Sequence, residues 1–286
     1  MVVGIFSPGS MGSGLGWALR DGGARVITTL QGRSPRTAGL ANKAGLEPVP
    51  TVDDMMREAA VVLVVTPPGA ALDAAASLAA AADRTGTRPL IADLNAIAPS
   101  TVDAMVAVLA VAGLDLVDGS VSGPPPTLRP GARVYLSGPR ANEVAALPWR
   151  HVEPIVLARP LGRASALKMS TASVYKGLNG LLTQALRAAA HYGVLDEVLA
   201  DLRANGLDHV GGVAPGATKA HRYVPEMREI AVAQQAAGLS PSLFQAFAEV
   251  YADIARTPLA EGDPESTDRT LSPAEIVRRL TSTAQS

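Results

Sequence analysis

Short apolar segments alternate with alanine-rich helical segments along the first half of the chain. The apolar segments are rich in β-branched residues and lie at residues 2–6, 25–29, 61–65, 89–93, 114–118 and 133–137. Continuous apolar runs of this length are typical of parallel strands that helices cover on both faces. The alternation therefore predicts repeated βαβ units, and hence an α/β fold with a doubly wound sheet.

The pattern changes near residue 160, where Pro160 and Gly162 interrupt the chain. Beyond this point no segment is as strand-like as residues 61–65. Helical segments are predicted at residues 163–191, 194–205, 218–237 and 241–256. We therefore expect two domains, an α/β domain over residues 1–160 and an all-helical domain over residues 161–286.

Composition narrows the class of protein. Of the 286 residues, 48% are hydrophobic and 18% charged, and the formal net charge is −1. The hydrophobic fraction is high enough for a sizeable core and excludes a disordered chain. The net charge lacks the basic excess that is typical of nucleic-acid-binding proteins. No apolar run approaches the ~20 residues of a membrane span, and the amino terminus lacks the basic start of a signal peptide. We expect a cytoplasmic protein with no nucleic-acid or membrane partner.

Residue types that form thiol or metal sites are scarce. The chain has no cysteine, which excludes disulfides, thiolate zinc sites and cysteine nucleophiles. Its four histidines are scattered without the spacing of metal ligands, so no metal site is predicted. Lysine is rare as well, and its four occurrences are Lys43, Lys168, Lys176 and Lys219.

A glycine-rich turn follows the first predicted strand. The usual string for dinucleotide binding is G-x-G-x-x-G, and here Ser7 takes its first position while Gly9 and Gly12 take the others. Glycines let the backbone approach a pyrophosphate, and the amino end of the following helix binds it. The turn predicts a Rossmann-type site that includes Ser7, Gly9, Ser10, Met11 and Gly12. The alternative is an ordinary turn between a strand and a helix.

The segment after the second strand indicates which dinucleotide binds. A carboxylate there would bind the ribose 2′-hydroxyl of NAD, and residues 28–37 contain none. They contain Arg33, Ser34 and Arg36 instead, and guanidinium groups bind phosphate oxygens in a bidentate fork. This pattern favours the 2′-phosphate of NADP(H), the alternative being a solvated arginine loop.

Four motifs in order give the chain a resemblance to a known superfamily. They are Gly9-Ser-Met-Gly12, residues 93–99 (DLNAIAP), residues 118–123 (DGSVSG) and residues 162–169 (GRASALKM). Together they resemble the β-hydroxyacid dehydrogenases, which include 6-phosphogluconate dehydrogenase and 3-hydroxyisobutyrate dehydrogenase. The later segment Arg222–Met227 is similar to a poorly characterised 6-phosphogluconate-dehydrogenase-like subgroup. The resemblance implies a 6-phosphogluconate-dehydrogenase-like helical domain after the Rossmann domain.

The resemblance also implies roles for single residues. Lys168 would be the general acid that protonates the substrate oxygen during reduction and the base in oxidation, which requires a lowered pKa. It implies cofactor contacts from Thr66, Pro67 and Asn95, and substrate contacts from Ser122 and Gly123.

Helical spacing adds candidate substrate contacts. Tyr175 shares one helical stripe with Lys168, and Lys176 lies about 12 Å further along the axis. Both lysines could therefore border one pocket, with Lys176 at a distal anion, the alternative being a surface lysine. Arg222 could meet an anionic substrate, or form an i,i+4 ion pair with Glu226.

One departure from the superfamily changes the expected activity. The superfamily places Asn four residues after the lysine, often preceded by His in 6-phosphogluconate dehydrogenase. Here these positions hold Ala172 and Thr171, and Thr171 is kept as a candidate substrate contact. Because the orienting amide is gone, we do not expect 6-phosphogluconate activity. Asn179 lies two turns further on, too far for a direct replacement.

Three functions follow from these observations. The first is an NADP(H)-dependent oxidoreductase that acts on a small, acidic hydroxy acid or its keto form. The second is imine reduction on the same scaffold, although imine reductases usually carry Asp or Tyr at the position of Lys168. The third is a cofactor-binding sensor without turnover. By analogy with the superfamily, the helical domain predicts a homodimer.

Overall fold

The computed structural model describes residues 1–281, apart from the side chain of Ala158. Two compact units divide the chain, Met1–Met169 and Ser170–Ser286. The units meet inside one long helix, α7 (Arg163–His191), and the domain border near residue 160 remains a prediction of the sequence. The last five residues of the predicted helical domain, 282–286, lie outside the described residues.

The first unit contains an eight-stranded sheet in the order β3-β2-β1-β4-β5-β6-β7-β8. All neighbouring strands are parallel except β6 and β7. The strands are β1 (Val2–Phe6), β2 (Arg25–Thr29), β3 (Glu47–Val49), β4 (Val61–Val64), β5 (Leu90–Asp93), β6 (Leu116–Ser122), β7 (Ala132–Ser137) and β8 (Val152–Ala158). This confirms the predicted doubly wound sheet. Chain order reverses between β1 and β4, and ligands bind at such switch points in open α/β sheets.

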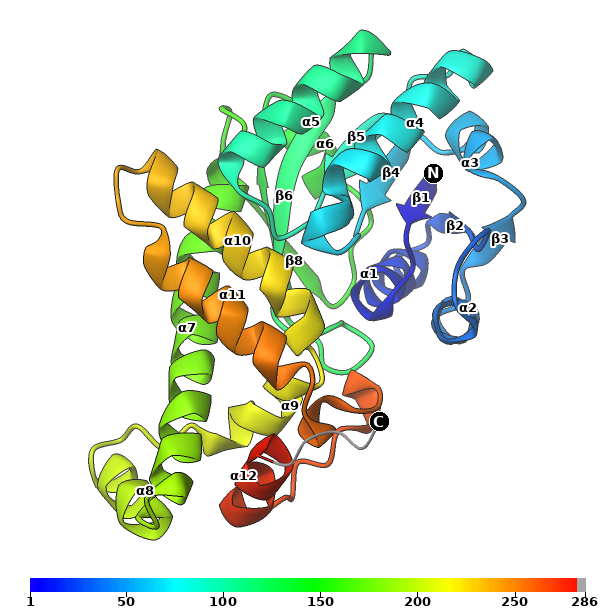
Figure 1. Ribbon diagram of the computed structural model, residues 1–286. Coiled ribbons are helices and arrows are strands. Elements are labelled where there is room, and N and C mark those ends of the chain that lie inside the picture. The colour runs from blue at the N-terminus through cyan, green and yellow to red at the C-terminus, as the bar shows by residue number, and fades with distance from the viewer. Residues whose placement is uncertain (282–286) are drawn as a thin grey trace. The chain divides into compact units, whose positions relative to one another are not determined.

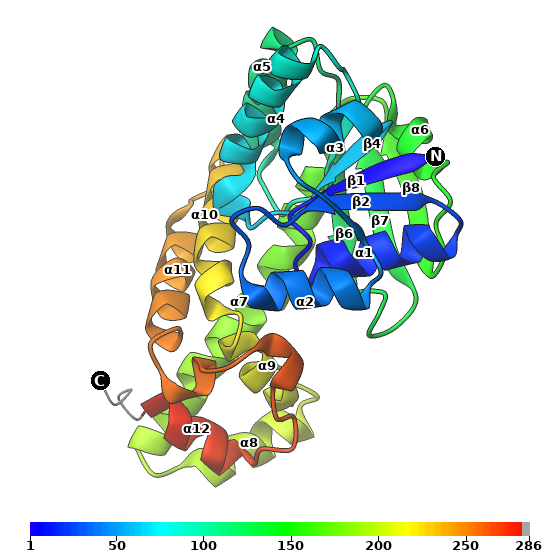
Figure 2. The same cartoon turned by 90° about the vertical axis from the view of Figure 1, so that its right-hand side faces the viewer.

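Helices cover both faces of this sheet (Figure 2), with α1 and α2 on one face and α3, α4 and α5 on the other. The helices of this unit that precede α7 are α1 (Ser10–Asp21), α2 (Pro35–Lys43), α3 (Val52–Glu58), α4 (Ala71–Thr85), α5 (Pro99–Val111) and α6 (Ala141–Ala145). In β4, Val61 and Leu63 belong to one apolar core, and Val62 and Val64 to the other. A strand that is buried on both faces needs such an uninterrupted apolar run, and for this reason β4 could be predicted from the sequence.

Two strands and part of a third differ from the prediction. β3 and β8 were not predicted, because β3 is three residues long and β8 carries Glu153 and Pro154. Both are edge strands, where a proline removes no central ladder hydrogen bond. β6 runs on to Ser122, so most of the segment that the resemblance marks as a substrate loop is strand.

The second unit is helical, as predicted. Its helices after α7 are α8 (Leu195–Ala204), α9 (Val213–Ala217), α10 (Ala220–Ala236), α11 (Ser242–Ile254) and α12 (Pro273–Thr281). α10 and α11 run side by side (Figure 1). A Cβ on Gly180 of α7 would lie 2.9 Å from the ring of Phe247 on α11, so this glycine allows the two helices to pack closely.

No helix among residues 1–281 is both long enough and apolar enough to cross a bilayer.

Candidate active site

The turn between β1 and α1 fits a phosphate group. Ser7 has a φ of 75°, and its carbonyl accepts a hydrogen bond of 2.9 Å from the amide of Gly9. A Cβ on Gly12 would lie 2.6 Å from that carbonyl oxygen, so glycine is required there. Nothing lies within 4 Å of a Cβ built on Gly9. The turn therefore leaves open backbone at the amino end of α1, which Ser10 and Met11 begin.

The loop after β2 holds an arginine that lacks a partner for one of its donors. The Arg33 guanidinium lies 5.5 Å from the centroid of the Phe6 ring, and its buried Nε has no hydrogen-bond partner among the described residues. Burial lowers the pKa of this guanidinium. An unsatisfied buried donor is costly, and a phosphate oxygen would satisfy it. Ser34 caps α2 by accepting from the Thr37 amide, and Arg36 lies in the first turn of α2.

The ends of β4 and β5 are joined by the side chain of Asn95. Its Oδ1 accepts a hydrogen bond of 2.7 Å from the Thr66 amide, and its Nδ2 donates to Thr66 Oγ1 at 3.0 Å and to Asp93 Oδ1 at 2.7 Å. Both amide hydrogens are thus engaged inside the protein, and Asn95 is buried. Asn95 thereby fixes the position of Thr66, which is partly exposed and precedes the exposed Pro67.

A buried carboxylate anchors the start of α7. Asp118 of β6 accepts hydrogen bonds from the Ala164 amide at 3.0 Å, the Ser165 amide at 3.2 Å and the Ser165 hydroxyl at 2.6 Å. The Ser137 hydroxyl of β7 donates to the same carboxylate at 2.7 Å. A carboxylate at a helix amino terminus satisfies free amides and interacts favourably with the helix dipole. This network fixes α7, and therefore Lys168 one turn later, against β6.

Lys168 lies at the predicted substrate segment. Its ammonium group donates a hydrogen bond of 2.7 Å to the carbonyl of Val121, next to Ser122 and Gly123. Gly123 has a φ of 112°, and a Cβ there would lie 3.2 Å from the Cα of Ala132, so glycine is needed where β6 ends. The structure thus brings together the proposed acid and both proposed substrate contacts of the first unit.

The second lysine of α7 has a different environment. Lys176 forms an ion pair with Glu226 of α10, in which the lysine side chain is 16% exposed and the glutamate side chain 8%. Its ammonium group also lies 4.9 Å from the centroid of the Tyr223 ring. The alternative of a surface lysine is wrong, because most of this side chain is buried. A contact between Lys176 and a distal anion of the substrate stays a prediction. The carboxylate partner of Lys176 lies 50 residues away, beyond what local spacing reveals.

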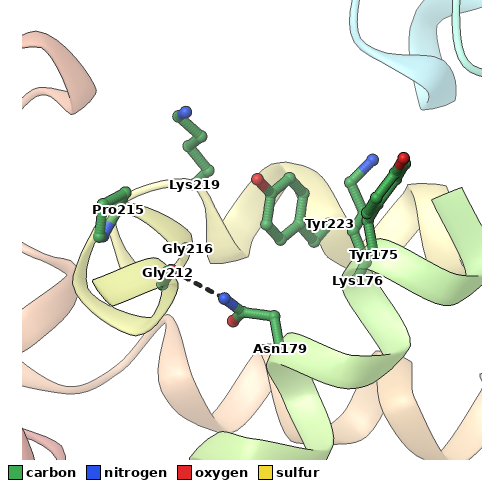
Figure 3. Close-up of a pocket in the computed structure, with 8 residues that line it drawn as sticks. All are labelled: Tyr175, Lys176, Asn179, Gly212, Pro215, Gly216, Lys219 and Tyr223. Carbon is green, nitrogen blue, oxygen red and sulfur yellow. Dashed lines mark hydrogen bonds between the residues drawn. The ribbon is translucent and has the colours of Figure 1, made fainter. Parts of the chain in front are cut away.

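A pocket of about 190 Å³ lies in the helical unit (Figure 3). It is lined by Tyr175, Lys176, Asn179, Gly212, Pro215, Gly216, Lys219 and Tyr223. The predicted contacts Tyr175 and Lys176 therefore share one pocket, whereas Lys168 belongs to the other unit. A single pocket for Lys168 and Lys176 remains a prediction. Of the other candidates in this unit, Thr171 lies on α7 and Arg222 in the first turn of α10.

Several residues with a clear structural role had no such role assigned from sequence. Asp118 and Ser165 were noted only as members of two motifs, and Ser137 only as the end of a predicted strand. Lys219 and Tyr223 of the pocket were also missed; the scarcity of lysine was the one feature that pointed to Lys219.

Two family profiles match the sequence. The NAD binding domain of 6-phosphogluconate dehydrogenase matches residues 2–152, and a domain of unknown function, DUF1932, matches residues 189–254. No curated protein is significantly similar to the chain in sequence.

Solved structures share the fold over nearly the whole chain. A conserved protein of unknown function, similar in structure to 3-hydroxyacid dehydrogenases, is 27% identical, with 89% of this chain and 96% of that chain covered and a TM-score of 0.64. The 3-hydroxyisobutyrate dehydrogenase of Mycobacterium tuberculosis, solved with L-serine, is 18% identical, with coverages of 98% and 99% and a TM-score of 0.67. An imine reductase of Streptomyces aurantiacus is 16% identical, with coverages of 99% and 100% and a TM-score of 0.56.

Proposed function

Because the chain belongs to the family with the NAD binding domain of 6-phosphogluconate dehydrogenase, within the β-hydroxyacid dehydrogenase superfamily, we propose that it is an NADP(H)-dependent oxidoreductase. Its substrate is a small hydroxy acid or the corresponding keto acid. The observation that carries the proposal is the ammonium group of Lys168, 2.7 Å from the Val121 carbonyl and beside Ser122 and Gly123. A nicotinamide, when bound, supplies or accepts the hydride.

Lys168 moves the proton in this proposal. In reduction its ammonium group donates a proton to the substrate oxygen, and in oxidation the neutral amine removes that proton. The Val121 carbonyl orients the amine, and Asp118 acts indirectly, by holding the start of α7. The Ser122 hydroxyl and the Gly123 amide supply neutral donors for the substrate carboxylate or hydroxyl.

The substrate class is tested with a panel of small keto acids and imines. We expect purified protein to oxidise NADPH with at least one small keto acid. Turnover of cyclic or acyclic imines with no keto acid would favour imine reduction, which the shared fold of the imine reductases makes the second candidate. Tight NADPH binding without turnover of any compound would instead indicate a sensor.

Preference for the phosphorylated cofactor is assigned to Arg33 and Arg36. We expect Arg33→Ala to weaken NADPH binding by about tenfold or more and to leave NADH binding within about twofold, because only NADPH carries the 2′-phosphate. Fluorescence titration of both cofactors measures the two constants, with the exposed Arg150→Ala as control. Equal losses for NADPH and NADH would contradict this assignment.

The helical unit is proposed to form a homodimer. Val174, Leu178 and Leu181 of α7 form an exposed apolar stripe at spacings of four and three residues, with exposures of 56%, 48% and 59%. Exposed apolar stripes on helices commonly mark protein interfaces. We expect light scattering to give twice the chain mass and Leu178→Glu to halve it. A monomeric mass for the unmodified protein would contradict the dimer.

A further inference from the structure

The two lysines of the helical pocket differ in their counter-ions. Lys176 is matched by the carboxylate of Glu226 and lies over the ring of Tyr223. Lys219, the residue before α10, has no hydrogen-bond acceptor or ion-pair partner among the described residues. Since buried and partly buried charges in proteins are normally paired, the pocket contains one neutralised cation and one that lacks a direct counter-ion.

More positive than negative side chains surround Lys219. Its pKa is lowered by burial first, and then by the positive charges of Arg269, Arg222 and Lys176, while Glu265 alone opposes them. A partly buried cation among further cations creates a positive potential that attracts an anion. α10 also begins at this point, and the amino end of a helix adds partial positive charge.

A neutral donor lies beside Lys219. The hydroxyl of Tyr223 makes no hydrogen bond among the described residues, and burial raises the pKa of this residue to about 12. It therefore stays protonated and can donate at neutral pH. Figure 3 shows the Tyr223 ring between Lys219 on one side and Tyr175 and Lys176 on the other, with its hydroxyl directed toward the Lys219 side.

Gly216 and the side-chain amide of Asn179 shape the floor of the pocket. Asn179 Nδ2 donates a hydrogen bond of 2.7 Å to the carbonyl of Gly212. A Cβ on Gly216 would lie 2.7 Å from Asn179 Oδ1, so the side chain of Asn179 fits only against glycine. Asn179 therefore shapes the floor, and its amide group is engaged in the protein.

We propose that this pocket binds the oxyanion group of a small ligand, a carboxylate or a phosphate, with Lys219 as its ionic partner and the Tyr223 hydroxyl as a neutral donor. Lys176 is not the ionic partner, because Glu226 already neutralises it. The site lies wholly within the helical unit, so the inference does not depend on the proposed oxidoreductase activity.

Direct binding to the full chain, without any nicotinamide, tests the proposal. Inorganic phosphate and succinate are titrated separately and followed by NMR, with uncharged succinamide as the control ligand. We expect saturable binding of at least one anion and none of succinamide. The anion that binds more tightly identifies a phosphate or a carboxylate as the natural group. Absence of saturable binding for both anions overturns the proposal.

Variants place the bound anion at this pocket. Lys219→Gln is expected to weaken binding about ten- to hundredfold, Lys219→Arg to retain most of it, and Tyr223→Phe to weaken it about three- to tenfold. The exposed Lys43→Gln is the matched control and should bind as the unmodified protein does. Binding that Lys219→Gln leaves unchanged overturns the proposal. NADPH oxidation is measured separately, so a lack of activity alone does not bear on this site.

Discussion

Lys168→Ala is expected to lower kcat about 10²- to 10³-fold while leaving the dissociation constant of NADPH within about twofold. The loss corresponds to about 3–4 kcal/mol of transition-state stabilisation. Its physical reason is the position of the amine, which the Val121 carbonyl holds beside Ser122 and Gly123. Arginine cannot replace it, because a guanidinium stays charged and cannot take part in proton exchange.

Steady-state kinetics with the best keto acid of the panel measure this effect, alongside a fluorescence titration of NADPH. Lys43→Ala removes an exposed lysine in the same unit and serves as the matched control, with no change expected in kcat. A Lys168→Ala protein that turns over at the unmodified rate would exclude the lysine as proton donor. A parallel loss of NADPH binding would assign it to cofactor binding instead.

Asp118→Ala is expected to destabilise the first unit by about 3–5 kcal/mol, the largest stability effect we predict. The carboxylate is fully buried and accepts four hydrogen bonds, from Ala164, Ser137 and twice from Ser165. Its removal leaves buried donors without a partner at the amino end of α7. Urea unfolding measures the loss, and amide hydrogen exchange in the first turn of α7 places it.

The matched control for this prediction is Asp115→Ala, three residues earlier in the chain. The Asp115 side chain is 66% exposed and pairs with Arg140, and exposed pairs of this kind contribute little. We expect a change within about 0.5–1 kcal/mol. Equal destabilisation by both substitutions, or unchanged exchange at Ala164 and Ser165 in Asp118→Ala, would show that Asp118 does not anchor the helix.

The elements that sequence predicts well are those whose signal is local. β4 is apolar at every position because both of its faces are covered, and Val62 and Leu63 pack into different cores. β8 is not predicted in this way, because an edge strand tolerates Glu153 and Pro154 and therefore is not a continuous apolar run. The glycine turn is local too, since the requirement for glycine at Gly12 comes from a carbonyl five residues earlier.

The parts of the site that sequence misses depend on contacts between distant segments. Helical spacing offered Arg222 as a partner for Glu226, whereas the fold pairs Glu226 with Lys176, 50 residues away. The two amide hydrogens of Asn95 are bonded to Thr66 and Asp93, and its place beside the nicotinamide ribose stays a prediction. Such pairings form only when packing brings strands or helices together. Local sequence patterns therefore do not predict them.

In the proposed reaction Lys168 supplies the proton during reduction of a keto acid by NADPH. Stopped-flow single-turnover kinetics isolate this proton transfer, because they observe the chemical step apart from product release. Protein preloaded with NADPH is mixed with the keto acid, and loss of NADPH absorbance is followed. We expect the rate for Lys168→Ala to be about 10²- to 10³-fold below that of the unmodified protein. Equal single-turnover rates for the two proteins would exclude Lys168 as the proton donor.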